Sequence, residues 1–274
     1  MVESSFSVGY RGWVPGPLRD ALRGDRLVLC LALLNARTPD VPAVAAACGY
    51  DAVYVDLEHT ACSLETAGML CVAALGAGIS GLVRVPSHDP SVVARVLDGG
   101  AVGVIVPHVN SAREAEAIVD AARFPPVGHR SICGPNAVSG YAPRPAAELT
   151  AELERHTVVA VMIETPDAVA ACDQIAAVNG VDMILLGPSD LTAEMGIHGQ
   201  YENEHFHRAV DSVAAACRAH GVALGVAGIK SVDLLERFAG LGLRFISAGT
   251  DVGMMTEAAT ARAHALRELD GQVG

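Results

Sequence analysis

The 274-residue sequence predicts an α/β protein folded as a (β/α)8 barrel, a TIM barrel. Three observations lead to this prediction: eight short apolar runs lie along the chain, Ala-rich amphipathic stretches separate most of them, and ionisable residues follow several runs at the same end. Repeated alternation of strand and helix produces a parallel sheet, and eight such units favour closure into a barrel. The length suits one large α/β domain or two small ones, and it can bury a substantial core without disulfides.

The eight predicted strands are short and rich in Val, Leu, Ile and Ala, as expected for parallel strands buried on both faces. They span residues 27–33, 52–57, 81–85, 103–107, 157–163, 182–186, 222–226 and 244–248. The stretch 204–219 is typical of the helices between them, because its apolar residues Phe206, Val210, Val213, Ala214 and Cys217 fall on one helical face.

Three segments depart from the regular alternation. Residues 1–16 are predicted to form an N-terminal arm, and residues 17–274 a single barrel domain that ends in a helix over 252–268. The stretch 124–145 is rich in Pro, Gly, Arg and Ser. So long an irregular insert is more often a functional loop than filler, with disorder as the alternative.

Charge and hydrophobicity exclude several classes of protein. Nineteen basic residues stand against 31 acidic ones, with a net charge of −12 and no basic stripe, so we expect neither nucleic acid nor a membrane as partner. The uncharged stretch 66–83 is interrupted by four glycines, which predicts a helix, a turn and a buried strand. The start lacks an apolar signal region and the seven cysteines include no C-x-x-C pair, so we expect a cytoplasmic protein with reduced cysteines.

Glycines 76, 78 and 81 fit the dinucleotide-binding spacing G-x-G-x-x-G. That motif requires a strand before the glycines and a helix after them, whereas here the predicted helix comes first and the strand follows. A dinucleotide-dependent oxidoreductase is therefore a poor interpretation of the sequence.

Ionisable residues follow five of the predicted strands, at the end where barrel enzymes place their chemistry. They are Asp56-Leu57-Glu58-His59, Arg84, His108, Glu164 and the turn Gly187-Pro188-Ser189-Asp190.

Glu164 ends a fully apolar strand, where an unpaired carboxylate would be costly to desolvate, so it needs a cation. Two carboxylates without a cysteine pair or an H-E-x-x-H helix indicate a hard ion such as Mg²⁺ or Mn²⁺. The alternative for Glu164 is a salt bridge with Arg84 or Arg130. The alternative for Asp190 is a helix N-cap, for a helix that begins near Leu191.

Asp56 and His59 are close enough at a strand end for the carboxylate to orient the imidazole as a general base. A structural histidine is the alternative. Arg84 offers a rigid fork for a substrate carboxylate or for the charge on an enolate oxygen. Its alternative is a pairing with Asp56 or Glu58.

Several segments resemble, in order and spacing, the HpcH/HpaI family of metal-dependent 2-oxoacid aldolases: GYDAVYVDLEH at 49–59, LVRVP at 82–86, GVIVPHVNSAREAEAIVDAARFPPVGHRS at 103–131, IETPDAV at 163–169 and LLGPSDLTAEMG at 185–196. The resemblance covers nearly the whole chain. It implies a barrel of the phosphoenolpyruvate/pyruvate-binding type and a carbon–carbon lyase that acts through a metal-bound pyruvate enolate on 4-hydroxy-2-oxoacids. It also implies a homo-oligomer, a hexamer or a dimer-based assembly, with helix 252–268 packing on a neighbouring subunit.

The resemblance also implies roles for the rim residues. Glu164 and Asp190 match the ligands of a divalent cation, Mg²⁺, Mn²⁺ or Co²⁺. His59 paired with Asp56 matches the dyad that moves a proton, and Arg84 matches the arginine that binds the keto oxygen and stabilises the enolate.

The substrates implied by the resemblance are a small 2-oxoacid and an aldehyde. The turn Gly187-Pro188-Ser189 is similar to the segment whose backbone N–H groups hold the substrate carboxylate. No Schiff-base lysine is required, and the only lysine of the sequence, Lys230, is poorly placed for that role.

Two residues depart from the family pattern, Met162 where Gln is usual and His108 where many members carry an apolar residue. A histidine at this position is similar to relatives such as macrophomate synthase, which decarboxylate oxaloacetate and join the enolate to another partner, and it would suit a second carboxylate. His108 could instead pack against the 124–145 loop. A non-catalytic, dicarboxylate-binding barrel is the alternative from another class.

Overall fold

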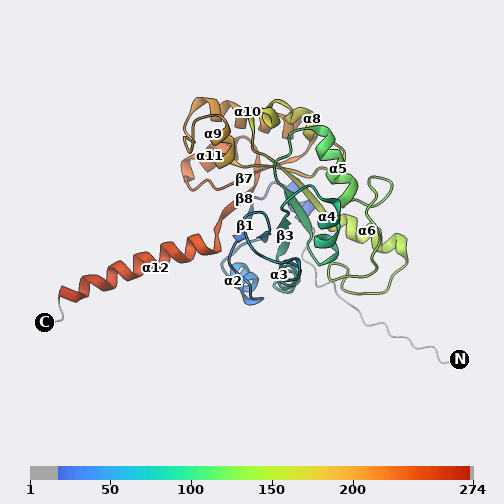
Figure 1. Ribbon diagram of the computed structural model, residues 1–274, viewed down its shortest axis with the longest axis horizontal. Coiled ribbons are helices and arrows are strands. Elements are labelled where there is room, and N and C mark those ends of the chain that lie inside the picture. Colours follow the sequence, from blue (N-terminus) through green and yellow to red (C-terminus); the bar gives the residue numbers. More distant parts are fainter. Residues whose placement is uncertain (1–17, 272–274) are drawn as a thin grey trace, which may run out of the picture.

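The computed structural model describes residues 18–271 and shows a closed parallel barrel whose strands follow one another in chain order (Figure 1). The predicted fold class is confirmed, and each strand begins and ends within two residues of its predicted range. The strands are β1 Val28–Leu33, β2 Ala52–Asp56, β3 Ser80–Arg84, β4 Gly103–Val106, β5 Val158–Ile163, β6 Met183–Leu186, β7 Ala223–Ala227 and β8 Leu243–Thr250. The predicted arm, residues 1–16, lies outside the described residues.

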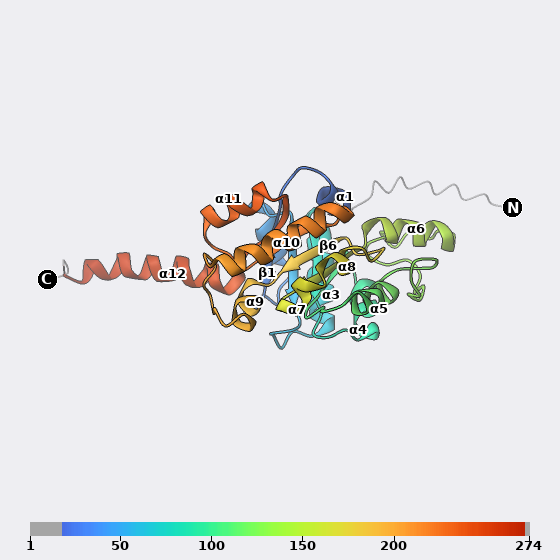
Figure 2. The same ribbon diagram turned by 90° about the horizontal axis from the view of Figure 1, so that it is seen from above.

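Helices surround the sheet in both views (Figures 1 and 2). Hydroxyl N-caps begin several of them: the Ser63 side chain accepts from the Thr66 N–H and that of Ser111 from the Glu114 N–H. The helices are α1 Leu18–Arg23, α2 Asp40–Ala47, α3 Leu64–Gly76, α4 Pro90–Asp98, α5 Ala112–Ala122, α6 Ala146–His156, α7 Pro166–Ala170, α8 Cys172–Ala176, α9 Pro188–Glu194, α10 Glu204–His220, α11 Val232–Gly240 and α12 Asp251–Arg267, followed by the 3-10 turn Glu268–Gly271.

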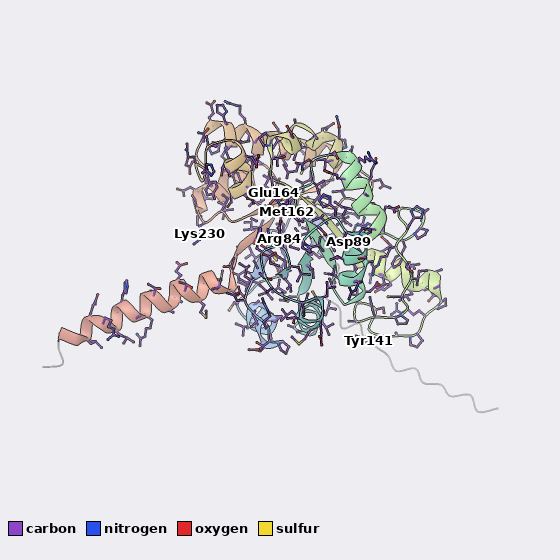
Figure 3. All side chains as sticks on the ribbon, in the orientation of Figure 1. Arg84, Asp89, Tyr141, Met162, Glu164 and Lys230 are labelled. Atoms are coloured by element: carbon purple, nitrogen blue, oxygen red, sulfur yellow. The ribbon has the colours of Figure 1, made fainter. Side chains whose placement is uncertain are left out.

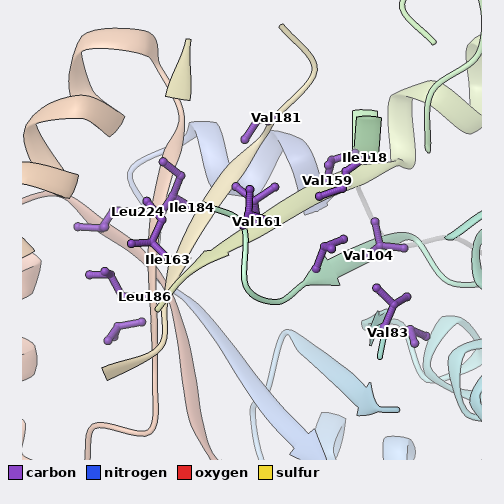
Figure 4. Close-up of a cluster of buried hydrophobic side chains, with 14 of the residues drawn as sticks. Val83, Val104, Ile118, Val159, Val161, Ile163, Val181, Ile184, Leu186 and Leu224 are labelled. Carbon is purple, nitrogen blue, oxygen red and sulfur yellow. The ribbon is translucent and has the colours of Figure 1, made fainter. Parts of the chain in front are cut away.

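Two apolar layers hold the barrel together. Alternate strand residues face the helices, as where Val161 and Ile184 lie in one cluster with Ile118 of α5 (Figure 4). The residues between them form a second cluster inside the barrel, which includes Met162 and Phe245. With both layers filled by apolar groups, polar side chains of the strands gather at the strand ends.

Ion pairs hold the amino-terminal end of the barrel. The buried carboxylate of Asp182, just before β6, accepts from Arg19 of α1 at 2.6 Å and from the buried Arg123. Arg123 also donates to the carbonyl groups of Thr157 and Gly180, at 3.1 and 3.0 Å. Breaking a buried pair costs about 3–5 kcal/mol, so this end of the barrel serves stability.

The 124–145 insert lies at the amino-terminal end too, between α5 and α6. Arg130 pairs with Asp98 at 2.7 Å, and Asn136 Nδ2 donates to the Leu97 carbonyl at 3.5 Å, both at the last turn of α4. Since α4 runs from the carboxyl end of the strands to the amino end, the insert is remote from His108. The alternative in which His108 packs on this insert is therefore wrong.

Three further predictions concern the glycine-rich segment, membrane-spanning helices and the C-terminal helix. The glycine-rich segment 76–81 runs from α3 into β3, the order that excludes the dinucleotide motif. Between residues 18 and 271, none of the helices has the length and apolarity to cross a membrane. Helix α12 begins one residue before its predicted range, buries no residue and projects away from the barrel (Figures 1 and 2).

Candidate active site

Five rim residues come together at the carboxyl end of the barrel. Asp56 ends β2 and stands opposite Arg84, the last residue of β3, in the strand register. His108 follows β4, Glu164 follows β5 and Asp190 lies beyond β6. Figure 3 shows Arg84 and Glu164 near the centre of the barrel. The prediction that consecutive strands deliver ionisable groups to one rim therefore agrees with the structure.

Asp56 and Arg84 form a bidentate ion pair. The Arg84 Nε and Nη2 atoms donate to the two oxygens of Asp56 at 3.0 and 2.6 Å, and Asp56 is fully buried. Burial alone would raise the pKa of Asp56, but the hydrogen bonds and charge of Arg84 outweigh it and the pKa lies below its usual value. The guanidinium also lies over the Tyr54 ring, 5.9 Å from its centroid. Arg84 is therefore held in one orientation.

His59 is not oriented by Asp56 in the way the sequence suggested. The Asp56 carboxylate contacts His59 through the backbone N–H, at 3.4 Å, while Arg84 occupies both of its oxygens. The exposed imidazole instead has its Nε2 atom 3.6 Å from Glu58 Oε2. Of the two interpretations of Arg84, the pairing with Asp56 and Glu58 is the one observed.

Glu58, which the sequence suggested only as a possible partner of Arg84, lies within the site. Its Oε2 lies 3.1 Å from Arg84 Nη1, and its Oε1 lies 3.0 Å from His108 Nε2. Oε2 is buried, and its contact with Arg84 is an ion pair without the geometry of a hydrogen bond. The spacing of Tyr54, Asp56 and Glu58 by two was the available signal, because strand residues alternate between faces.

Glu164 is a buried carboxylate, with its side chain 2% exposed. It accepts the backbone N–H of His108 at 2.8 Å, and the His108 Nδ1 atom lies 3.3 Å from the same oxygen. Burial raises the pKa of Glu164 and the charges of Glu58 and Asp190 add to the rise, against the opposing effect of His108. The arginine partner considered from the sequence is absent among residues 18–271, since Arg84 and Arg130 pair elsewhere.

The turn from Gly187 to Asp190 lies beside Glu164. A Cβ atom on Gly187 would lie 2.6 Å from Glu164 Oε1, so the carboxylate rests directly on this backbone. Helix α9 begins at Pro188 with Gly187 as its N-cap, which places Asp190 in the first turn. The alternative in which Asp190 is the N-cap is therefore wrong. Its side chain is exposed, and its charge contributes to the raised pKa of Glu164. The Ser189 hydroxyl lies 3.3 Å from that of Tyr201.

Two further residues bear on the predicted chemistry. Lys230 lies in the loop after β7, exposed and well away from Arg84 and Glu164 (Figure 3). Met162, two residues before Glu164, is buried in the apolar cluster inside the barrel.

Known proteins share this sequence and architecture. The family model described as HpcH/HpaI aldolase/citrate lyase matches residues 30–258. A 4-hydroxy-4-methyl-2-oxoglutarate aldolase of Hapsidospora irregularis is 38% identical over 242 residues, which cover 87% of this chain and 90% of the relative.

Two crystal structures extend the comparison. An HpcH/HpaI aldolase from Desulfitobacterium hafniense has a TM-score of 0.87 and 30% identity, and the match covers 92% of this chain and 97% of the other. Macrophomate synthase has a TM-score of 0.81 and 25% identity, covering 95% and 93% of the two chains.

Proposed function

The chain belongs to the HpcH/HpaI aldolase/citrate lyase family, and we propose that it is a divalent-metal-dependent aldolase acting on 4-hydroxy-2-oxoacids. The observation that carries the proposal is the buried Glu164 carboxylate, which lies among further carboxylates and beside a rigidly held arginine. A small 2-oxoacid such as pyruvate is the product of cleavage, and an aldehyde or ketone is its partner.

A divalent cation fits the rim residues. Glu164 is buried beside the carboxylates of Glu58 and Asp190, whose charges add to the rise of its pKa, and a cation would relieve this repulsion. Glu164 and Asp190 supply oxygen ligands, which suits Mg²⁺, Mn²⁺ or Co²⁺. Within residues 18–271 no group of three or more His, Cys, Asp or Glu side chains is arranged for a metal, so water and substrate oxygens would complete the shell. When bound, the cation would act as a Lewis acid towards the keto oxygen.

The side chains of the rim divide the remaining work. Arg84, fixed by Asp56, donates to the keto oxygen of the substrate and stabilises its negative charge as the enolate forms. His59 takes the proton of the C4 hydroxyl, the C3–C4 bond breaks, and the aldehyde leaves. A proton then returns to C3 of the enolate and gives pyruvate. The Gly187 to Ser189 turn holds the substrate carboxylate through its backbone N–H groups.

The proposal is tested with protein stripped of metal by EDTA and a panel of 4-hydroxy-2-oxoacids. We expect cleavage to stop and to return with Mg²⁺, Mn²⁺ or Co²⁺. Full activity in the metal-free protein would reject the proposal. The Glu164→Gln variant also separates an enzyme from a dicarboxylate-binding barrel, because an enzyme loses nearly all turnover whereas a binder loses only part of its affinity.

Decarboxylation of oxaloacetate followed by carbon–carbon bond formation is a second candidate. It is favoured by His108, whose side chain is 56% exposed at the rim and could approach a second carboxylate, and by the structural likeness to macrophomate synthase. Loss of CO₂ from oxaloacetate that is no faster than with the metal alone would exclude it.

We also propose that α12 packs on a second copy of the chain in a homo-oligomer. The helix is 17 residues long and buries none of them, whereas most helices in proteins gain their stability from packing one face against the rest of the fold. At its root, a cavity of about 810 Å³ is lined by apolar side chains of α2 and α12, namely Val41, Val44, Val252, Met254 and Met255. A stable 28.2 kDa monomer in light scattering would contradict this assembly.

A further inference from the structure

The peptide at His108 has an unusual conformation. Its φ is +55°, in the left-handed region that histidine enters more often than most residues but that is strained for β-branched ones. This conformation turns the His108 N–H towards Glu164, where it donates to Oε2 at 2.8 Å. The side chain makes separate contacts, with Glu58 at 3.0 Å and Glu164 at 3.3 Å. Backbone and imidazole can therefore be tested independently.

A chain of hydrogen bonds holds this peptide in place. The Asn110 Nδ2 atom donates to the His108 carbonyl at 3.0 Å, and the Asn110 Oδ1 atom accepts from the Thr165 hydroxyl at 2.5 Å. The Val109 N–H donates to the Met162 carbonyl at 3.2 Å. Because Thr165 directly follows Glu164, the loop after β4 and the loop after β5 are tied together on both sides of the carboxylate.

These contacts leave the Glu164 carboxylate little freedom. Oε2 is held by the His108 N–H, and Oε1 lies against Gly187, where even a Cβ atom would be only 2.6 Å away. A group confined in this way presents its free lone pairs in one direction. The His108 imidazole lies between this carboxylate and that of Glu58, at 3.3 Å from Glu164 Oε2 and 3.0 Å from Glu58 Oε1.

We propose that the left-handed peptide of His108, locked by Asn110 and Thr165, is the device that orients Glu164 for its cation. The three residues are positioning residues, and this role of His108 lies in its backbone. The inference rests on the proposed function, since it takes Glu164 to be a metal ligand. Groups that orient a ligand in this way typically contribute about 10- to 100-fold to metal affinity.

The test compares four variants and one control variant of the full-length protein by their affinity for Mn²⁺ alone, measured by electron paramagnetic resonance. Gly and Asn both accept a left-handed backbone, so His108→Gly and His108→Asn are expected to bind Mn²⁺ within about threefold of the parent protein or more tightly. His108→Val strains the same backbone and Asn110→Ala releases it, so both are expected to bind at least about tenfold more weakly. Asn179→Ala, at the amino-terminal end of the barrel, is the matched control and is expected to bind as the parent does.

Two outcomes overturn the inference. Loss of Mn²⁺ binding in His108→Gly would assign the role to the imidazole, and parental affinity in both His108→Val and Asn110→Ala would show that the peptide orients nothing. A parent protein that binds no Mn²⁺ would refute the proposed function instead. A crystal structure of metal-free Asn110→Ala then decides the orienting role by itself, because we expect the Glu164 side chain to move and an unmoved side chain overturns the inference. Circular dichroism confirms that each variant folds.

Discussion

Replacing Gly187 by Ala places a methyl group against the proposed metal ligand. Gly187 has a φ of −104°, which any residue can adopt, so the substitution changes only the space beside Glu164. The new Cβ would lie 2.6 Å from Oε1 and 2.7 Å from Cγ of Glu164, against an ordinary contact of 3.4 Å or more. The carboxylate must therefore move by about 0.8 Å, which breaks its alignment with the His108 N–H and with the cation.

The expected result is Mn²⁺ affinity reduced about 10- to 100-fold, with a parallel loss of turnover at limiting metal. Overpacking of this kind also costs about 1–3 kcal/mol of stability, which urea unfolding measures. Gly240→Ala is the matched control, because a Cβ there meets nothing within 4 Å and Ala favours the end of α11. If Gly187→Ala binds Mn²⁺ as the parent does, Glu164 is not a ligand in the orientation described.

Three further predictions follow from the rim. Glu164→Gln should lower turnover by more than about a hundredfold. Without metal, the melting temperature of this variant should equal or exceed that of the parent, because the substitution removes a costly buried charge. A large fall in melting temperature would contradict this. The folded-state pKa of Asp56 lies below the unfolded value of about 3.9, so its stabilising effect is complete above that pH and is lost as pH falls through the folded pKa. Asp56→Asn should therefore weaken the fall in the free energy of unfolding at acid pH, measured by urea titrations. An unchanged dependence of that free energy on pH would count against the Asp56–Arg84 pair. Lys230→Ala should keep full aldolase activity, and borohydride added with pyruvate should not inactivate the parent, whereas inactivation would indicate a Schiff base.

The barrel could be predicted because its strands are buried on both faces. Parallel strands under helices consist of nearly continuous apolar residues, so runs such as 157–163 stand out between polar helices, and the structure places β5 at Val158–Ile163. Sequence patterns could not give the end of β8, where the strand continues to Thr250, or the break between α7 and α8 near Ala171. These boundaries depend on contacts between segments far apart in the chain.

The rim residues could be predicted as a set but not their pairings. Strand ends identify Asp56, Arg84 and Glu164 as neighbours of one opening, since parallel strands finish at one edge. The cationic partner of each carboxylate depends on side-chain direction. Asp56 meets Arg84 because β2 and β3 place them in register, whereas the His59 imidazole lies nearer to Glu58. The contact of Gly187 with Glu164 follows from the register of β5 and β6, in which Ile163 pairs with Leu186 and the Gly187 N–H donates to the Ile163 carbonyl. The sequence does not reveal this register.

The ion pairs around Asp182 lie at the opposite end of the barrel from the catalytic rim. Substitutions in the loops after the strands do not touch these ion pairs, so the barrel can stay folded while the residues of the rim change. Descendants of such a chain can therefore acquire new acceptors or new donors one loop at a time, with the folded scaffold inherited unchanged.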